Sequence, residues 1–248
     1  MKSFIILSNT SQNKVEAITE TLENLKIKHN RFDDIITSGE FLEYLGQSKN
    51  KKYRKIHKLL KKKKCYLISN GKKSNVIKNL NLKPVNYKNA KFILATSIKP
   101  YKKIDHIKNI LKKLLKKKIE MICTNPDQYV FDGKVGNFVN QVGILAKFYE
   151  SKHGVVHYIG KPYKNIFDFA LRKINIPKNK IIMIGDSLIT DILGATRSGI
   201  KSVLVYDGFK KGEKKKFRNL SLEKIVEKLK IKPDFIINCA AITNIETC

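Results

Sequence analysis

Short runs of apolar residues alternate along the chain with longer segments in which apolar residues recur every three or four positions. The short runs predict buried strands, and the longer segments predict amphipathic helices. We expect strands at residues 4–7, 65–68, 92–95, 119–123, 155–159, 181–184, 202–206 and 235–237. We expect helices at residues 15–25, 38–45, 76–80, 104–115, 138–149, 162–174, 190–199 and 221–229. Strands that alternate with helices in this way predict an α/β fold with a parallel sheet.

The stretch from Ile181 to Gly199 carries the most specific chemistry in the sequence. Its apolar start predicts a strand that is buried on both faces and that Gly185 ends. Asp186 then follows at the carboxyl edge of the sheet, where α/β proteins bind ligands. We expect Asp191 in the first turn of the next helix, which Gly199 ends. A carboxylate at a strand tip can ligate Mg²⁺ and a second one can orient it, whereas the structural alternative is that both cap the loop and the helix.

Polar residues also follow three other predicted strands. Ser8 and Asn9 follow the first strand, and the turn at 124–127 follows a later one. Lys161 stands between a strand and a helix, a position that suits a phosphate group. An ordinary exposed lysine is the simpler interpretation, but Lys161 lies one strand–helix unit before Asp186. The sequence contains neither a GxGxxG nor a P-loop pattern.

Capping residues and composition define the expected boundaries. Thr10 or Ser11 can cap the first helix, and Thr37 with Ser38 can cap the second, which we expect Gly46 to end. A lysine-rich stretch then separates two α/β segments, which predicts a smaller domain inserted into a larger one. We place the first part of the core at residues 1–46, the inserted domain at 47–154 and the second part of the core at 155–248.

The chain is strongly basic, with a formal net charge of +30 over 248 residues. The excess is almost all lysine and is spread over the polar faces of the helices, while Asn and Ile are also abundant. An AT-rich genome produces this combination, so we do not expect a nucleic-acid partner; salt-dependent binding to DNA or RNA stays as a third hypothesis. A surface of this kind would attract an anionic substrate such as a phosphate ester.

The four cysteines, Cys65, Cys123, Cys239 and Cys248, show no CxxC spacing. They predict small buried residues in a reducing cytosol rather than disulfides or a metal site. The apolar run near the N-terminus is too short for a signal peptide or a membrane span. We therefore expect a soluble, cytoplasmic protein with no membrane partner.

Several of these motifs together resemble one family. IGDSLITDILGA at 184–195, GIKSVLV at 199–205, TNPD at 124–127 and GKP at 160–162 resemble the haloacid dehalogenase (HAD) superfamily of phosphohydrolases, class IIA, which is NagD-like. The resemblance covers essentially the whole chain. It implies a Rossmann-like parallel-sheet core with an inserted smaller α/β cap, and Mg²⁺-dependent phosphatase activity on a small phosphate ester. It also leaves open a homodimer that forms through the cap.

The resemblance implies a role for each matching residue. The expected catalytic residues are Ser8, Lys161, Asp186 and Asp191, the expected substrate-binding residues are Ser8, Asn9, Asn125, Asp127 and Lys161, and the expected metal ligand is Asp186. The serine would donate a hydrogen bond to the transferring phosphoryl group, and the lysine would neutralise its charge. The first aspartate of the fourth motif would ligate Mg²⁺, and the second would support it. The cap turn would shape the substrate pocket.

The sequence departs from the family pattern at the nucleophile, which is an aspartate in a DxD sequence after a buried strand. No aspartate here has that context, since Asp33 and Asp34 lie in a polar link. We interpret the chain as a truncated phosphatase that is inactive as it stands; the alternative is a non-catalytic, phosphatase-like binding protein or a gene remnant. The missing strand would leave a gap of roughly 10 Å between the strands that end at Ser8 and Gly185. Those strands must then pair with each other, another chain must fill the gap, or the domain will be poorly stable.

Overall fold

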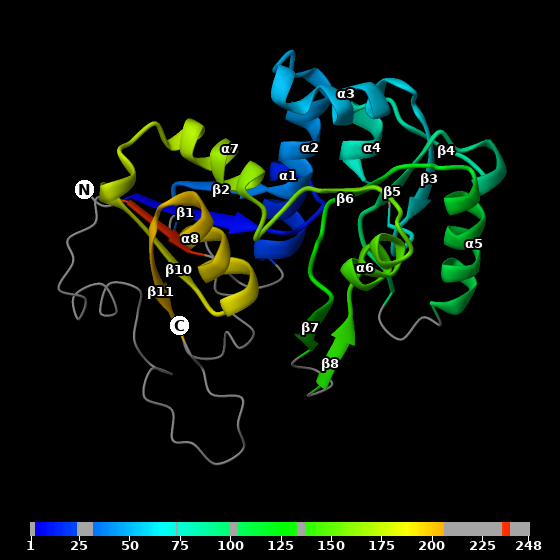
Figure 1. The fold of residues 1–248 in the computed structure, drawn as a ribbon. Coiled ribbons are helices and arrows are strands. Elements are labelled where there is room, and N and C mark those ends of the chain that lie inside the picture. Colours follow the sequence, from blue (N-terminus) through cyan, green and yellow to red (C-terminus); the bar gives the residue numbers. More distant parts are fainter. Residues whose placement is uncertain are drawn as a thin grey trace. The chain divides into compact units, whose positions relative to one another are not determined.

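The computed structural model describes residues 3–23, 32–72, 74–99, 104–132, 137–205 and 235–238. The chain divides into two compact units, and Figure 1 labels many of their helices and strands. The first unit comprises Met1–Leu7, Ile18–Ile36 and Pro162–Cys248, and the second comprises Ser8–Ala17 and Thr37–Lys161. Each unit has its own five-stranded sheet with helices, so the predicted α/β class is confirmed.

The sheet of the first unit has the strand order β11-β10-β12-β1-β2. Its strands are β1 (Ser3–Ser8), β2 (Asp34–Thr37), β10 (Ile181–Gly185), β11 (Lys201–Leu204) and β12 (Phe235–Asn238). The pairs β10–β11, β10–β12 and β1–β12 are parallel. Every residue of β10 is buried, which confirms the strand predicted from the apolar run.

The C-terminal strand β12 lies between β1 and β10 and pairs with both. Phe235 is the register partner of Ser3 on one side and of Ile181 on the other. The chain itself therefore occupies the position between these two strands. Two alternatives from the sequence, that β1 and β10 would pair with each other or that another chain would fill the gap, are wrong. Because β12 pairs along both edges, it gives the polar backbone groups of β1 and β10 their hydrogen-bonding partners.

Four described helical segments of the first unit lie near β10 in sequence. They are α7 (Lys164–Ile174), the 3₁₀ turn η5 (Lys178–Lys180), the π-helical turn η6 (Leu188–Ile192) and α8 (Leu193–Ser198). Gly194 lets α8 approach α7 closely, because a Cβ there would lie 2.3 Å from the ring of Phe167. Gly199 ends α8 in the left-handed conformation (φ +69°), as predicted. Asp191 lies in the π-helical turn instead of an α-helical first turn, and α7 begins two residues after Pro162.

The sheet of the second unit has the strand order β4-β3-β5-β6-β9, and all four pairs are parallel. Its strands are β3 (Lys64–Ile68), β4 (Lys83–Pro84), β5 (Phe92–Ala95), β6 (Met121–Cys123) and β9 (Val156–Tyr158). The central strand β5 is buried at all four residues. The predicted strands at 65–68 and 92–95 are confirmed, and β9 joins this sheet although the sequence suggested that residues 155–161 belong to the core.

The remaining helical segments are α1 (Lys14–Glu16), the π-helical turn η1 (Ala17–Leu22), α2 (Ser38–Gln47), the 3₁₀ turn η3 (Lys51–Tyr53), α3 (Arg54–Lys61), α4 (Asn75–Asn79), the 3₁₀ turn η4 (Tyr87–Asn89), α5 (Asp105–Lys116) and α6 (Gly143–Ser151). Thr37 caps α2 by accepting the Glu40 N–H at 2.9 Å, as predicted. Gly46 does not end α2, which continues through Gln47.

The start of the first helix was predicted wrongly. Asn13, and neither Thr10 nor Ser11, is the N-cap of α1, and its side chain accepts the Glu16 N–H at 3.0 Å. The Ser11 hydroxyl is used elsewhere, since it donates to the carbonyl oxygen of Thr96 at 2.8 Å.

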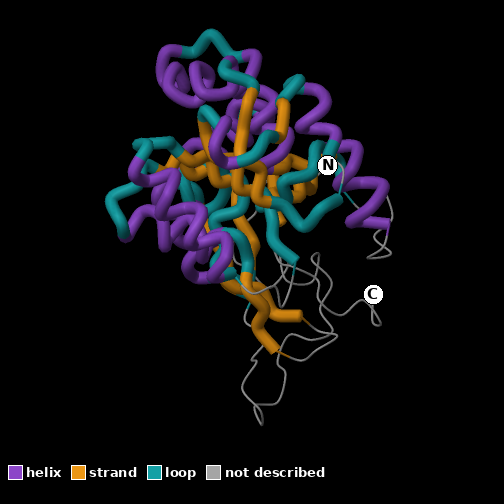
Figure 2. The backbone as a smooth tube through the Cα atoms, turned by 90° about the vertical axis from the view of Figure 1, so that its right-hand side faces the viewer, coloured by secondary structure: helices purple, strands orange, loops and turns teal. Residues whose placement is uncertain are grey.

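A two-stranded antiparallel hairpin replaces the start of the helix predicted at 138–149. Its strands are β7 (Tyr129–Asp132) and β8 (Asn137–Asn140), and α6 starts only at Gly143. Figures 1 and 2 show the hairpin apart from the other strands of its unit. Tyr129 and Phe138 are 55% and 60% exposed.

Some expectations fall outside the described residues, namely the helix at 221–229, Tyr206, Cys239 and Cys248. Within the described ranges, no helix is both long and apolar enough to cross a membrane.

Candidate functional site

Two neighbouring strands of the second sheet bring two of the sequence motifs together. β6 and β9 run in parallel, and Cys123 is the register partner of Tyr158. The chain leaves β6 into the turn at 124–127 and leaves β9 into Gly160 and Lys161. Because parallel strands end at the same edge of a sheet, the turn and the lysine emerge side by side.

Asn9, which follows β1, joins these two segments. Its Oδ1 accepts the backbone N–H of Lys161 at 2.6 Å, and its Nδ2 donates to the backbone oxygen of Lys161 at 3.2 Å. The same Nδ2 donates to Oδ1 of Asp127 at 3.1 Å. Asn9 is only 6% exposed and Lys161 only 7%. We call these three residues, all in the second unit, the Asn9 cluster.

The turn that carries Asp127 is fixed by its own polar groups. Asn125 Oδ1 accepts the Asp127 N–H at 3.0 Å, and the Asp127 carbonyl accepts the Gly143 N–H at 3.0 Å. A Cβ on Gly143 would lie 2.2 Å from the carbonyl oxygen of Pro126, so only glycine allows α6 to start this close to the turn. Asn125 therefore supports Asp127 from within the turn.

Gly160 allows the chain to pass close to Asn9. Its φ of +142° lies in a region that side chains other than glycine rarely adopt. A Cβ there would lie 2.7 Å from Asn9 Oδ1, 2.8 Å from Pro126 Cδ and 3.0 Å from Ser38 Oγ. The glycine before Lys161 is thus a requirement of the Asn9 cluster.

The loop after β1 is held at the start of α2. The Thr10 carbonyl accepts the Gly39 N–H at 3.2 Å, and the Thr37 hydroxyl donates to the Gln12 carbonyl at 2.7 Å. The Ser8 hydroxyl oxygen accepts the Thr10 N–H at 3.2 Å. Since that hydroxyl acts as an acceptor in this bond, its proton can still be donated to another group.

The two aspartates of the fourth motif lie in one loop of the first unit. Asp186 is exposed, whereas Asp191 is 1% exposed. Asp191 Oδ2 accepts the Ser187 N–H at 3.1 Å, which ties the loop to the turn that follows it. A Cβ on Gly185 would lie 2.3 Å from the Cβ of Asp191, so β10 needs glycine at its end.

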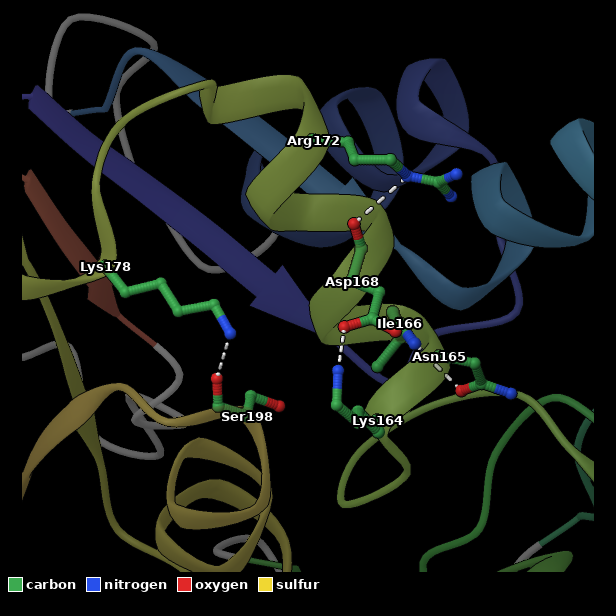
Figure 3. Close-up of polar contacts among 7 residues, drawn as sticks. All are labelled: Lys164, Asn165, Ile166, Asp168, Arg172, Lys178 and Ser198. Carbon is green, nitrogen blue, oxygen red and sulfur yellow. Dashed lines mark hydrogen bonds and ion pairs between the residues drawn. The ribbon is translucent and has the colours of Figure 1, made fainter.

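Polar contacts on α7 and α8 stabilise the helices on either side of this loop (Figure 3). Lys164 forms an ion pair with Asp168 one turn later on α7. Lys178 Nζ donates at 2.8 Å to the carbonyl oxygen of Ser198, the last residue of α8. A cation at this end of a helix complements the partial negative charge of its unpaired carbonyl groups.

The two described cysteines are free and buried, as predicted. Burial raises the pKa of the Cys123 thiol to about 12, although its Sγ donates to the Asn125 carbonyl at 3.3 Å. Burial likewise raises the pKa of the Cys65 thiol to about 12. Both thiols are therefore protonated at neutral pH and unsuited to act as nucleophiles.

The carboxylates of the first unit fit Mg²⁺ in their chemistry. Mg²⁺ is commonly held by one or two carboxylates, with water and phosphate oxygens completing its shell. Asp186 and Asp191 offer two carboxylates on one loop. The described part of the chain contains no group of three or more His, Cys, Asp or Glu side chains that could hold a metal ion.

The predicted site residues thus fall into two sets. The second unit contains Ser8, Asn9, Asn125, Asp127 and Lys161, and the first contains Asp186 and Asp191. The sequence did not reveal that Asn9 binds the backbone of Lys161, or that Gly160 makes this approach possible. The only signal was the position of a glycine directly before the lysine, after a predicted strand.

Comparison with known proteins agrees with this architecture. Residues 158–238 match the HAD-hydrolase-like family model. Glycerol-3-phosphate phosphatase of Homo sapiens is 32% identical over 108 residues, which are 43% of this chain and 33% of that protein. Ribonucleotide monophosphatase NagD of Escherichia coli K12 is 34% identical over 88 residues, which are 35% of this chain and 33% of that protein. In these alignments the chain spans about a third of the length of each curated relative.

A solved structure shows the same fold over most of the chain. A haloacid dehalogenase-like hydrolase from Brucella suis 1330 superposes with a TM-score of 0.71 at 21% identity, covering 83% of this chain and 76% of that one. Residues 158–238 thus match the HAD-like family, and the chain has the fold of haloacid dehalogenase-like hydrolases, which confirms the resemblance that the motifs predicted. Its curated relatives include the NagD phosphatase, and NagD is also among the solved structures with a similar fold.

Proposed function

We propose that this protein has a phosphatase-type site that binds a small phosphate monoester. The observation that carries the proposal is the buried Lys161, held by Asn9 beside Asp127 at a sheet edge. Support also comes from relatives that are named as phosphatases of glycerol 3-phosphate and of ribonucleotide monophosphates. A dianionic phosphate ester is a ligand that this lysine would attract strongly, because burial weakens the screening of its charge by water.

Each residue has a chemical task in this proposal. Phosphoryl transfer spreads negative charge over oxygen atoms, so positioned donors and cations supply most of the catalysis. Lys161 would neutralise that charge, and the Ser8 hydroxyl would donate a hydrogen bond to a phosphoryl oxygen. Asn125 would hold the turn that shapes the substrate pocket, and Asp127 would line it.

The cofactor in this proposal is Mg²⁺. Asp186 would ligate the ion through its exposed carboxylate, and Asp191 would fix the loop through its bond to the Ser187 N–H. When bound, the ion would supply positive charge to the phosphate oxygens. In this proposal Asp186 is the metal ligand, so water and the substrate would complete the shell.

A second candidate is a phosphate-binding protein without turnover. It is favoured by the given sequence, in which no aspartate stands in a DxD pattern after a buried strand. Lys161 and Ser8 would then bind phosphate, but no covalent intermediate would form.

Hydrolysis of 4-nitrophenyl phosphate separates the two candidates. The full chain is assayed with Mg²⁺ and with a chelator, beside the variants Lys161→Met and Asp186→Asn. Turnover that needs Mg²⁺ and both side chains supports the phosphatase. Absence of turnover, together with phosphate binding that Lys161→Met abolishes, supports the binding protein. Absence of both refutes the phosphate site in either form.

The proposal also includes three expectations about the compartment, the oligomeric state and nucleic acid. The protein would act in the cytoplasm, and a homodimer, if it forms, would form through the inserted cap domain at residues 47–154. Nucleic acid would not be a partner, because the lysines are spread over the chain instead of being grouped in one motif.

A further inference from the structure

The side chain of Asn9 makes three hydrogen bonds to two other segments of the second unit. We propose that Asn9 is a positioning residue that sets the place of Lys161 and Asp127 and does not itself bind the substrate. This inference deepens the proposed function and rests on it for its consequence, but the contacts themselves can be tested separately.

The match between Asn9 and Lys161 is specific to a carboxamide. An amide presents an acceptor and a donor side by side, as a peptide group does. Asn9 Oδ1 faces the N–H of Lys161 and Nδ2 faces its carbonyl oxygen, so one side chain pairs with both backbone polar groups of one residue. Neither a carboxylate nor a hydroxyl can pair with both groups in the same way.

The donors of Asn9 are fully used by the protein. A carboxamide has two N–H donors, and Nδ2 makes two bonds, one to the Lys161 carbonyl and one to Asp127 Oδ1. No side-chain N–H of Asn9 is left to donate to a phosphate oxygen. The family resemblance placed Asn9 beside the substrate, whereas its contacts indicate that it acts through Lys161 and Asp127.

The hydrogen bonds between Asn9 and Lys161 are buried, so their loss lowers stability strongly. Asn9 and Lys161 are each less than one-tenth exposed, so water competes poorly for these hydrogen bonds. Without the carboxamide, the N–H and the carbonyl of Lys161 would each lose a buried partner. The chain around Gly160 would then lack its contact with the loop after β1.

Asp127 is held in place by other groups of the second unit, and Gly160 leaves room for Asn9 beside Lys161. Asp127 is held by Asn125 and by the start of α6 at Gly143. Gly160 admits Asn9 only because it has no Cβ. Asn9 is therefore the link by which a fixed turn determines where Lys161 lies.

Two variants remove hydrogen bonds of the Asn9 cluster in different ways. Asn9→Ala removes all three bonds. Asn9→Asp keeps the size and the acceptor for the Lys161 N–H, but it places oxygen against the Lys161 carbonyl and the Asp127 carboxylate. The double variant Asn9→Asp with Asp127→Asn returns an N–H between positions 9 and 127 and keeps the wild-type net charge. Asn50→Ala is the matched control, because Asn50 only caps an exposed 3₁₀ turn in the same unit.

The first readout is hydrogen exchange of the Lys161 amide in the full chain, resolved by NMR. We expect exchange at least about tenfold faster in Asn9→Ala than in the wild type and in Asn50→Ala, because the acceptor of that N–H is gone. Unchanged exchange would overturn the inference, whatever the protein binds. Thermal unfolding of each variant shows whether the second unit is still folded, and if Asn9→Ala unfolds it, Asn9→Leu, which has nearly the same size and also lacks the acceptor, decides.

The second readout is the Kd for inorganic phosphate by calorimetry. We expect both Asn9 variants to weaken binding about tenfold or more, and the double variant to recover at least about a third of that loss on a logarithmic scale. Equal affinity in wild type and Asn9→Ala would overturn the inference. If the wild type itself does not bind phosphate, the proposed function fails. The exchange experiment still decides whether Asn9 holds the backbone of Lys161.

Discussion

Substitution of Gly185 by alanine tests how tightly the fourth-motif loop is packed. The added Cβ would lie 2.3 Å from Asp191 Cβ and 2.5 Å from both Asp191 Cγ and Oδ2. To relieve this clash, the Asp191 side chain must move by about 1 Å, since ordinary contacts begin near 3.4 Å. Such a movement would break the 3.1 Å bond between Asp191 and the Ser187 N–H.

The cost follows from these two effects. Overpacking of a buried site costs about 1–3 kcal/mol. Loss of a hydrogen bond to a buried charged group costs about 1.5–3 kcal/mol. We therefore expect Gly185→Ala to lower the free energy of unfolding of the first unit by about 2.5–6 kcal/mol in total.

Gly199→Ala is the control on the same strand–helix unit. Gly199 has a left-handed backbone, but the nearest atom to its added Cβ is Lys178 Nζ at 3.9 Å. Its cost is backbone strain alone, about 1–2 kcal/mol. Urea unfolding followed by circular dichroism measures both variants. A loss for Gly185→Ala no larger than for Gly199→Ala would refute the packing argument for Asp191.

Three further predictions concern charge, thiols and metal. Lys178→Ala should lower stability by about 0.3–1 kcal/mol, because it removes the cation at the Ser198 carbonyl, and thermal unfolding at low and high salt measures this. The thiols of Cys65 and Cys123 should resist iodoacetamide at pH 8 until urea unfolds the chain. Since their folded pKa values are raised from 9.0 to about 12, stability should fall as pH rises from about 9 towards 12, because the unfolded chain loses its thiol protons first. Asp186→Asn should abolish any rise in melting temperature caused by Mg²⁺, in a titration with a chelator as reference.

Each of these has a result that counts against it. Lys55 is exposed, so Lys55→Ala is the control for Lys178→Ala. An equal loss of stability in both variants would show that only the general loss of a positive charge matters. Modification of Cys123 in the folded protein would contradict its burial. For the pH effect, Cys65→Val should flatten the decline between pH 9 and 12 by up to about 1.4 kcal/mol per pH unit. A Mg²⁺ response that survives Asp186→Asn would place the ion elsewhere.

Local pattern was enough to predict the elements that are buried on both sides. The apolar run at 181–184 and the run at 92–95 are fully buried central strands, as predicted, because nothing but burial explains such a run. The glycine after α8 was predictable for a similar reason, since its left-handed conformation has a strong residue preference.

Contacts between residues far apart in the sequence determine features of two helix starts that the local pattern did not predict. Asn13 is the N-cap of α1, whereas the Ser11 hydroxyl donates to the carbonyl of Thr96, 85 residues away. The helix expected from 138 begins at Gly143, because residues 137–140 pair with 129–132 instead. The apolar residues of that stretch match a helical period, and only strand pairing distinguishes the two structures.

The order of the strands was beyond local pattern for the same reason. β12 was predicted as a strand, but its place between β1 and β10 depends on which backbone edges are available in the assembled sheet. The site shows a similar limit. Lys161 could be singled out by its position after a strand, whereas its hydrogen bonds with Asn9 join residues 152 positions apart.

Titration of the full chain with inorganic phosphate at physiological salt is the most direct test of the proposed function, with Lys161→Met and Lys152→Met in parallel. Lys152 is exposed, so its loss controls for the general attraction of anions to a chain of net charge +30. The proposed site predicts saturable binding of one phosphate that Lys152→Met retains and Lys161→Met loses. Binding that both variants retain equally, or no saturable binding in the wild type, would contradict it.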